Sequence, residues 1–360
     1  MQSAPTRRLS RRHARFMAAS IASMLALPAG AAIPPSERAV LMAIYQQAGG
    51  ADWTDHTGWG GAVGTECAWH RVICNGSSTH VIQLALYGNH LVGTLPPLSD
   101  LGGLQAANFD TNQLTGSIPA LSALSQLTEF GVEQNQMTGS IPSLTGLVHL
   151  QHFSAAQNNL TGPIPPLSSL VALSVFFVNH NQLAGPIPDL GGLTHLNIFN
   201  AEDNRLTGIT SLAGLSNLTY LRLGNNQLEG PIPPLTDLGN LLLFTADHNR
   251  LSGPLPSLAG LVHLSGLVLD HNMISGPLPS LAGMNALNDV VLDHNAMSGP
   301  IPDPPAPSQL VAGISTLCPN GFSPSANGAT NAAWDAATGI SPWNQACDPD
   351  RIFRDSFESD

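Results

Sequence analysis

The stretch LVLDHNMISGPLP, Leu267–Pro279, decides how this sequence folds. Its first three residues are typical of the middle of a β-strand, whereas the Gly-Pro-Leu-Pro run that soon follows is incompatible with a strand interior. Asp270, His271 and Asn272 stand between these two parts. Such side chains belong either to a metal or acid/base site or to the architecture of the fold, and the remainder of the sequence decides between these two roles.

The same pattern recurs along most of the chain, with an asparagine at nearly constant spacing. Successive asparagines are 23 residues apart except for one step of 22, and most are followed by an apolar residue, a glycine and a Leu-Pro or Ile-Pro pair. A period of roughly 20–29 residues with leucines at this spacing is the signature of a leucine-rich repeat solenoid. The repeated residues are Asn89, Asn112, Asn135, Asn158, Asn181, Asn204, Asn226, Asn249, Asn272 and Asn295.

Each copy predicts one rung, meaning one turn of the solenoid. Leu267 and Leu269 alternate inward in a short strand, and successive strands stack in parallel about 4.8 Å apart. The Asn272 amide can donate to and accept from main-chain groups that the strand no longer satisfies, so we predict that the ten asparagines form a structural ladder. Pro277 and Pro279 suit an extended return path on the outer side.

The repeat unit L-x-x-L-x-L-x-x-N-x-L-x-G-x-I-P-x-L resembles the plant-type extracellular leucine-rich repeat, although it is one residue shorter after the proline. The resemblance implies an α/β solenoid, a leucine-rich repeat horseshoe with short parallel strands on the concave face. It also implies an irregular or polyproline convex side, a helical N-terminal cap and disulfide-bonded caps. The tail, residues 351–360, resembles terminal tags of exported bacterial proteins, which suggests a secreted bacterial member of this family.

Both ends of the stack have sequences that predict caps. Residues 36–50 predict an amphipathic helix with Ser36 as its N-cap. Cys67–Cys74 resembles the plant cap motif C-x-W-x-G-V-x-C, except that Arg71 replaces the glycine, and we expect disulfides Cys67–Cys74 and Cys318–Cys347. The nearby Trp53, Trp59 and Trp69 cover the first rung or, alternatively, stack on carbohydrate. We therefore expect a signal peptide at 1–31, an N-terminal cap at 32–80, ten repeats at 81–303, a C-terminal cap at 304–350 and a tail at 351–360.

The N-terminal segment and the charge predict export. Five arginines precede an apolar run, residues 16–27, and a small-x-small pattern at residues 29–31, which together are typical of a secretory signal peptide. Without residues 1–31 the chain has seven arginines against 24 acidic residues, a formal charge of −17. Such a charge disfavours nucleic acid and anionic membranes as partners, and no later apolar run is long enough to span a bilayer. We expect a protein that is secreted, extracellular or at the cell surface.

The two positions just before each repeated asparagine are predicted to be exposed strand positions that line the concave face. On the last three rungs these positions hold an Asp-His pair each, and imidazoles on adjacent rungs are close enough to share zinc or copper. Duplication of one repeat explains the identity without any selection for chemistry, so we expect no metal ion and no cofactor. Apolar and arginine side chains elsewhere on this surface, Leu243 and Val268 among them, suit an interface. The predicted ligand-binding residues are Phe177, Glu202, Tyr220, Arg222, Asp247, His248, Asp270, His271, Asp293 and His294.

The sequence contains no G-x-S-x-G, H-E-x-x-H, C-x-x-C or phosphate-loop motif, so we expect no enzyme. The resemblance implies a recognition module that binds a protein, a peptide or a polysaccharide on its concave face. A cell-surface structural or adhesion protein is the alternative, and a hydrolase that uses the Asp/His positions is a remote one.

Overall fold

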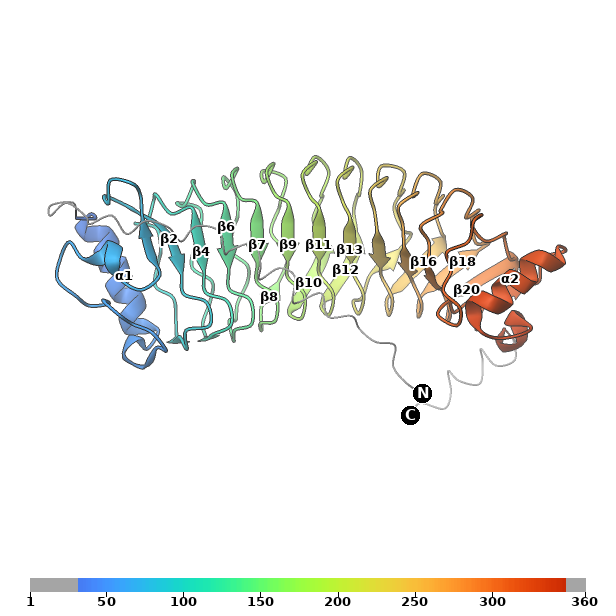
Figure 1. Ribbon diagram of the computed structural model, residues 1–360, viewed down its shortest axis with the longest axis horizontal. Helices are drawn as coiled ribbons and strands as arrows, with labels where there is room; N and C mark the ends of the chain where they lie inside the picture. The colour runs from blue at the N-terminus through green and yellow to red at the C-terminus, as the bar shows by residue number, and fades with distance from the viewer. Residues whose placement is uncertain (1–31, 348–360) are drawn as a thin grey trace. The chain divides into compact units, whose positions relative to one another are not determined.

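The computed structural model describes residues 32–347 (Figure 1). The expected signal peptide and tail lie outside the described residues. Within the described range, no helix combines the length and hydrophobicity that a membrane crossing requires.

Ten short parallel strands, one from each repeat, build most of an 11-stranded sheet on the concave side (Figure 1). The eleventh strand, β1 (Val72–Cys74), pairs antiparallel with β2 at the first edge. Phe199 pairs with Phe176 in the neighbouring strand, so equivalent residues align on every rung. The parallel strands are β2 (Val81–Ala85), β4 (Ala106–Asn108), β6 (Glu129–Gly131), β7 (His152–Ser154), β9 (Val175–Phe177), β11 (Ile198–Asn200), β13 (Tyr220–Arg222), β15 (Leu243–Thr245), β17 (Gly266–Val268) and β19 (Asp289–Val291).

A second row of short parallel strands begins just after the repeated asparagines, where the sequence suggested only an extended return path. Pro254 pairs with Ser275 of the next rung, and Gly253 before it has a φ of 77°. The extended segment lies at the same place on each rung, so its main-chain groups can pair with those of the next rung. Pro254, which has no N–H to donate, lies at the end of its strand. These strands are β3 (Val92–Gly93), β5 (Gln113–Leu114), β8 (Thr161–Gly162), β10 (Gln182–Ile187), β12 (Arg205–Ile209), β14 (Glu229–Gly230), β16 (Arg250–Pro254), β18 (Met273–Gly276), β20 (Ala296–Pro300) and β21 (Gly321–Ser323).

The core is one continuous stack of leucines and phenylalanines. Phe130, Phe153, Phe176 and Phe199 are buried on four consecutive rungs, with ring centroids 5.3–5.9 Å apart. A single rung cannot bury its apolar side alone, so the stack as a whole supplies the hydrophobic stabilisation.

The N-terminal cap contains α1 (Pro35–Gln47) and the 3-10 turns η3 (Gly50–Asp52) and η4 (Glu66–Ala68). The prediction that Ser36 caps the helix is wrong: the N-cap is Pro34, and Pro35, whose ring presets the helical φ, is the first helical residue. The alternative that the tryptophans stack on carbohydrate is also excluded, because all three rings are buried in a mutual cluster. These are Trp53, Trp59 and Trp69.

The C-terminal cap contains α2 (Gly328–Thr338) and the turn η5 (Trp343–Ala346). The side chain of Asn327 accepts a hydrogen bond from the main-chain N–H of Ala329 and so caps α2. Trp334 of α2 and Trp343 of η5 are buried within this cap. Both expected disulfides, Cys67–Cys74 and Cys318–Cys347, are present, one in each cap.

Candidate ligand-binding face

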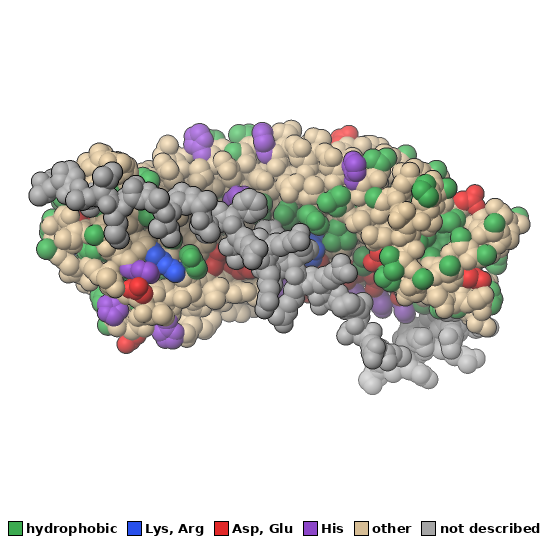
Figure 2. Space-filling model, viewed as in Figure 1, with side chains coloured by type: hydrophobic (Ala, Val, Ile, Leu, Met, Phe, Trp, Pro, Cys, Tyr) green, Lys and Arg blue, Asp and Glu red, His purple; other side chains and the backbone are tan. Residues whose placement is uncertain are grey.

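The outward side chains of the 11-stranded sheet, with the residues that follow each strand, form what we call the strand face. In its middle, Val175, Ile198, Tyr220 and Leu243 are aligned in register on four adjacent strands and are half-buried. We call these four residues the apolar strip. Figure 2 shows apolar side chains gathered over the middle of the visible face. Such a strip offers a ligand apolar area that the fold itself leaves partly exposed.

The strip includes two residues that the sequence analysis missed. Tyr220 was predicted, whereas Val175 and Ile198 were not, although all of them stand six residues before a repeated asparagine. That spacing is the signal that would have found them. Phe177, two residues after Val175, also faces outward and is half-buried.

Arg222 lies beside the strip and is paired with a carboxylate. Its Nη1 is 3.8 Å from Glu202 Oε2, and the Thr245 hydroxyl donates to Glu202 Oε1 at 3.1 Å. Burial raises the pKa of Glu202, while the positive charge of Arg222 and the bond from Thr245 oppose the shift. The structure therefore brings together two predicted residues, Glu202 and Arg222, next to a third, Tyr220.

Two half-buried carboxylates on the strand face have strongly raised pKa values. Burial raises the pKa of Asp110 to about 7, even though its Oδ1 accepts a 2.6 Å hydrogen bond from the main-chain N–H of Glu133. Burial, followed by the negative charge of Asp270, raises the pKa of Asp289 to about 6. Oδ1 of Asp289 is buried and finds no hydrogen-bond partner within residues 32–347. Neither residue was singled out from the sequence, because the perturbation depends on contacts between rungs.

His248, His271 and His294, which we call the histidine column, do not lie on strands as the sequence suggested. They follow the strands in turns, with φ values of 50°, 52° and 54° in the left-handed region. Their side chains remain exposed, whereas Asp270 is buried rather than freely solvated. The prediction that Asp270 is open surface is therefore wrong, because neighbouring rungs cover it.

The histidine column is stacked and paired with carboxylates. Adjacent ring centroids are 4.2 Å apart in both steps, and the rings are nearly parallel. The Nδ1 atoms lie 3.2, 2.8 and 2.8 Å from the Oδ2 atoms of the preceding aspartates. Burial raises the pKa of Asp270, while its bond with His271 acts in the opposite direction. The pairs are Asp247-His248, Asp270-His271 and Asp293-His294.

The repeated asparagines link rung to rung. Asn272 donates to the carbonyl of Ala246 in the preceding rung at 2.9 Å and accepts from the N–H of Leu251 at 2.9 Å. An additional member that the sequence analysis missed, Asn320, is fully buried, donates to the carbonyl of Leu292 and accepts from the N–H of Met297. Asn320 stands 25 residues after Asn295, outside the regular period.

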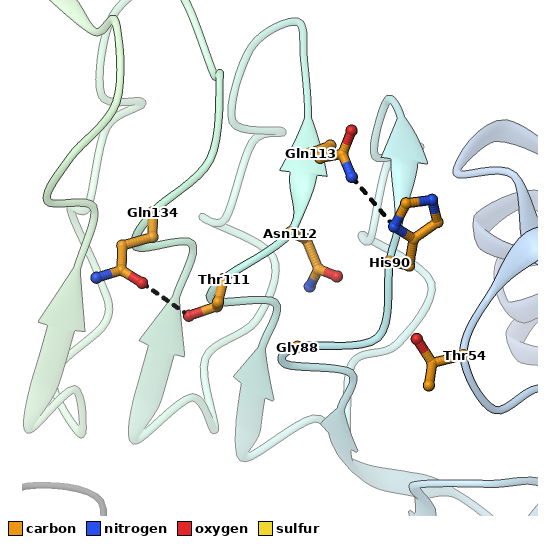
Figure 3. Close-up of a pocket in the computed structure, with 7 residues that line it drawn as sticks. All are labelled: Thr54, Gly88, His90, Thr111, Asn112, Gln113 and Gln134. Carbon is orange, nitrogen blue, oxygen red and sulfur yellow. Dashed lines mark hydrogen bonds between the residues drawn. The ribbon is translucent and has the colours of Figure 1, made fainter.

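A cavity of about 320 Å³ lies at the N-terminal end, where the cap meets the first rungs (Figure 3). Its lining residues are almost all of polar type, and two hydrogen bonds of 3.1 Å join them: Gln113 Nε2 donates to His90 Nδ1, and the Thr111 hydroxyl donates to Gln134 Oε1. The lining residues are Thr54, Gly88, His90, Thr111, Asn112, Gln113 and Gln134. The cavity holds none of the predicted ligand-binding residues, and its paired side chains leave few groups available to a ligand.

Comparisons with known proteins agree with this geometry. The Leucine Rich Repeat family model matches residues 217–238. The crystal structure of a TDR receptor is 30% identical over 73% of this chain and 46% of that chain, with a TM-score of 0.63. The Arabidopsis receptor kinase HAESA ectodomain, in complex with an IDA peptide hormone ligand, is 26% identical over 80% of this chain and 50% of that chain, with a TM-score of 0.56.

A plant ice-binding protein is 27% identical over 82% of this chain and 99% of that chain, with a TM-score of 0.61. The chain thus spans about half the length of the receptor structures and nearly all of the ice-binding protein. No curated protein matches the sequence. The asparagine ladder, the matched repeat and these structures identify the fold as a leucine-rich repeat solenoid and support an assignment to the leucine-rich repeat family.

Proposed function

We propose that the protein is a secreted, non-catalytic recognition module that binds a peptide or protein segment on its strand face. The apolar strip is the observation that carries the proposal. Four aligned apolar side chains on a concave sheet offer a continuous contact for an extended ligand, and aromatic and arginine side chains such as Tyr220 and Arg222 are typical anchors of interfaces.

The charge around the strip favours a ligand that carries basic residues. Glu202 lies beside Arg222, and Leu243 reaches over Gly266 towards the rung of Asp289. A lysine or arginine of the ligand placed there would lie beside the half-buried carboxylate of Asp289. We therefore propose an extended segment with apolar residues over the strip and a basic residue beside Asp289.

The structural relatives support this proposal without deciding the ligand. HAESA is described in complex with a peptide hormone, which is the ligand class proposed for this chain. The two disulfides fit an extracellular protein, since such bonds persist in oxidising compartments.

The test is selection of binders from a random peptide library on the full chain, followed by affinity measurement with strip variants. We expect Tyr220→Ala and Leu243→Ala to weaken the selected peptides about tenfold or more, whereas the exposed Val262→Ala should leave affinity unchanged. Peptides that bind equally well to all variants would contradict the proposal. Capture of wall polysaccharide alone would favour the carbohydrate alternative.

Export and retention need a separate measurement. We expect the protein to accumulate free in the culture medium of an expressing cell. Retention at the cell surface that is lost on removal of residues 351–360 would support the structural or adhesion alternative instead. Accumulation inside the cell with free thiols would contradict secretion.

Ice binding is a second candidate, favoured by an array of exposed hydroxyl groups that recurs just after the repeated asparagines and is interrupted by Ala184 and Glu229 at the equivalent positions. Exposed Thr or Ser residues stand three positions after several repeated asparagines, about 4.8 Å apart per rung. The array includes Thr138, Thr161, Thr207 and Ser298. If this array binds ice, the full chain should inhibit ice recrystallisation, and the double variant Thr138→Lys, Thr161→Lys should lose this activity. Thr236→Lys, at an exposed position outside the array, is the control and should keep it.

A further inference from the structure

The histidine column places metal-ligating atoms of two rungs around one carboxylate. Oδ2 of Asp270 is 2.8 Å from Nδ1 of His271, on its own rung, and 3.9 Å from Nδ1 of His248, on the preceding rung. Ligand-capable atoms of these three residues all lie within 4.8 Å of one another. We propose that His248, Asp270 and His271 bind one divalent transition-metal ion.

The distances suit such an ion. Ligands that are about 2.0–2.1 Å from zinc lie roughly 3.3 Å from one another at the tetrahedral angle. The separations of 2.8 and 3.9 Å bracket this value, so small side-chain rotations bring the three atoms around a common centre. The fourth position of a tetrahedral ion would be left to water.

The surroundings hold these ligands in place. The imidazoles of His248 and His271 are stacked 4.2 Å apart, and left-handed turns fix their main chain on consecutive rungs. Asp270 is buried, so its carboxylate is confined, unlike a flexible surface acid. A site of this kind requires little ordering when the ion binds, and confined ligands favour affinity.

A second group, His271, Asp293 and His294, also has its ligand-capable atoms within 4.8 Å, but its carboxylate is less suited. Asp293 is already engaged through Oδ1 by the hydroxyl of Thr316 as well as by His294. The two groups share His271, so a single ion is expected, and we assign it to the group that contains Asp270. Two imidazoles and carboxylate oxygen favour Zn²⁺, Co²⁺, Ni²⁺ or Cu²⁺ over Ca²⁺ and Mg²⁺.

The test uses the full chain without a polyhistidine tag, freed of metal by a chelator. We expect Zn²⁺ titration calorimetry to show one ion per chain with micromolar or tighter affinity, and Co²⁺ to give visible absorption bands of a low-coordinate site. Zn²⁺ should also raise the melting temperature by mass action on the folded state. No heat of binding at millimolar Zn²⁺ would overturn the proposal.

Two variants test the assignment without disturbing the turn. Asp270→Asn and His271→Asn should each weaken Zn²⁺ binding at least tenfold, because each variant loses one metal ligand. Asparagine keeps the shape of the aspartate at 270 and tolerates the left-handed φ at 271, so the main chain should stay as it is. His263→Asn, at an exposed histidine outside both groups, is the matched control and should bind like the unmodified chain. Asp293→Asn should change the affinity less than threefold. Equal binding by all variants, or loss in Asp293→Asn but not in Asp270→Asn, would overturn the assignment.

Discussion

The side-chain oxygen of Asn204 accepts a hydrogen bond from the main-chain N–H of Leu183, 2.9 Å away on the preceding rung. The amide nitrogen of Asn204 donates to the carbonyl of Val178 on that rung at 3.0 Å and to that of Ala201 on its own rung at 3.2 Å. One buried side chain thus satisfies main-chain groups of two rungs, at the point where strand pairing ends.

Replacing this side chain should destabilise the solenoid. We expect Asn204→Ala to lower the free energy of unfolding by about 1–3 kcal/mol, because buried main-chain groups on both rungs lose their partner. Denaturant unfolding followed by circular dichroism measures the change. His263→Ala, at an exposed site, should shift stability by less than about 0.5 kcal/mol. An unfolding midpoint for Asn204→Ala equal to that of this control would show that the ladder is dispensable.

Arg71 gives a second test of stability, in the N-terminal cap. Its φ is 60°, and its Nη1 donates to the carbonyls of Ala85 and Tyr87 while the guanidinium lies 4.1 Å from the Tyr87 ring centroid. Arg71→Ala and Arg71→Gly lose the same contacts, but only alanine keeps the cost of a left-handed main chain. We therefore expect Arg71→Gly to be the more stable variant, by about 1 kcal/mol in denaturant unfolding. The reverse order would mean that the turn relaxes out of this conformation.

The sequence predicted the main sheet because each rung repeats the same inward positions, so Leu267 and Phe199 occupy the core for the same reason. The glycine expected at Arg71 from the plant cap motif was also informative, since the main chain adopts the left-handed conformation there. Asn320 escaped prediction because it belongs to an irregular rung in the C-terminal cap. Periodicity is informative only where the period holds.

The raised pKa of Asp110 could not be predicted from the sequence for a different reason. A Cβ on Gly131 would lie 2.7 Å from Oδ1 of Asp110, so Asp110 leans over the next rung at a place that only a glycine leaves open. This packing buries the carboxylate and raises the pKa of Asp110 to about 7. The contact joins residues 21 positions apart, and the identities of neither residue alone reveal it.

The Asp110 carboxylate should make stability depend on pH. Its pKa is about 7 in the folded protein and near 4 in the unfolded chain, so the folded state retains a proton that the unfolded state releases between these values. The free energy of unfolding contributed by this group therefore falls as pH rises from about 4 to 7. We expect Asp110→Asn to remove this decline and to be more stable than the unmodified chain at pH 8, by about 1–3 kcal/mol.

Unfolding measured at pH 4.5 and pH 8 tests the prediction, with Asp100→Asn at an exposed position as the control. The control should leave the difference between the two pH values unchanged. A pH dependence that persists in Asp110→Asn would assign it to another group.

The variant Asp289→Asn tests whether the Asp289 carboxylate binds the ligand or supports the fold. Its Oδ1 is buried without a hydrogen-bond partner within residues 32–347, beside the negative charge of Asp270, so the ionised form costs stability. We expect Asp289→Asn to raise the free energy of unfolding at pH 8 by about 0.5–2 kcal/mol. The same variant should weaken basic peptides selected on the strand face about tenfold, because their cationic group loses its charged partner. A gain in stability with no loss of affinity would place the basic residue of the ligand elsewhere, and a loss of stability would show that Asp289 supports the fold.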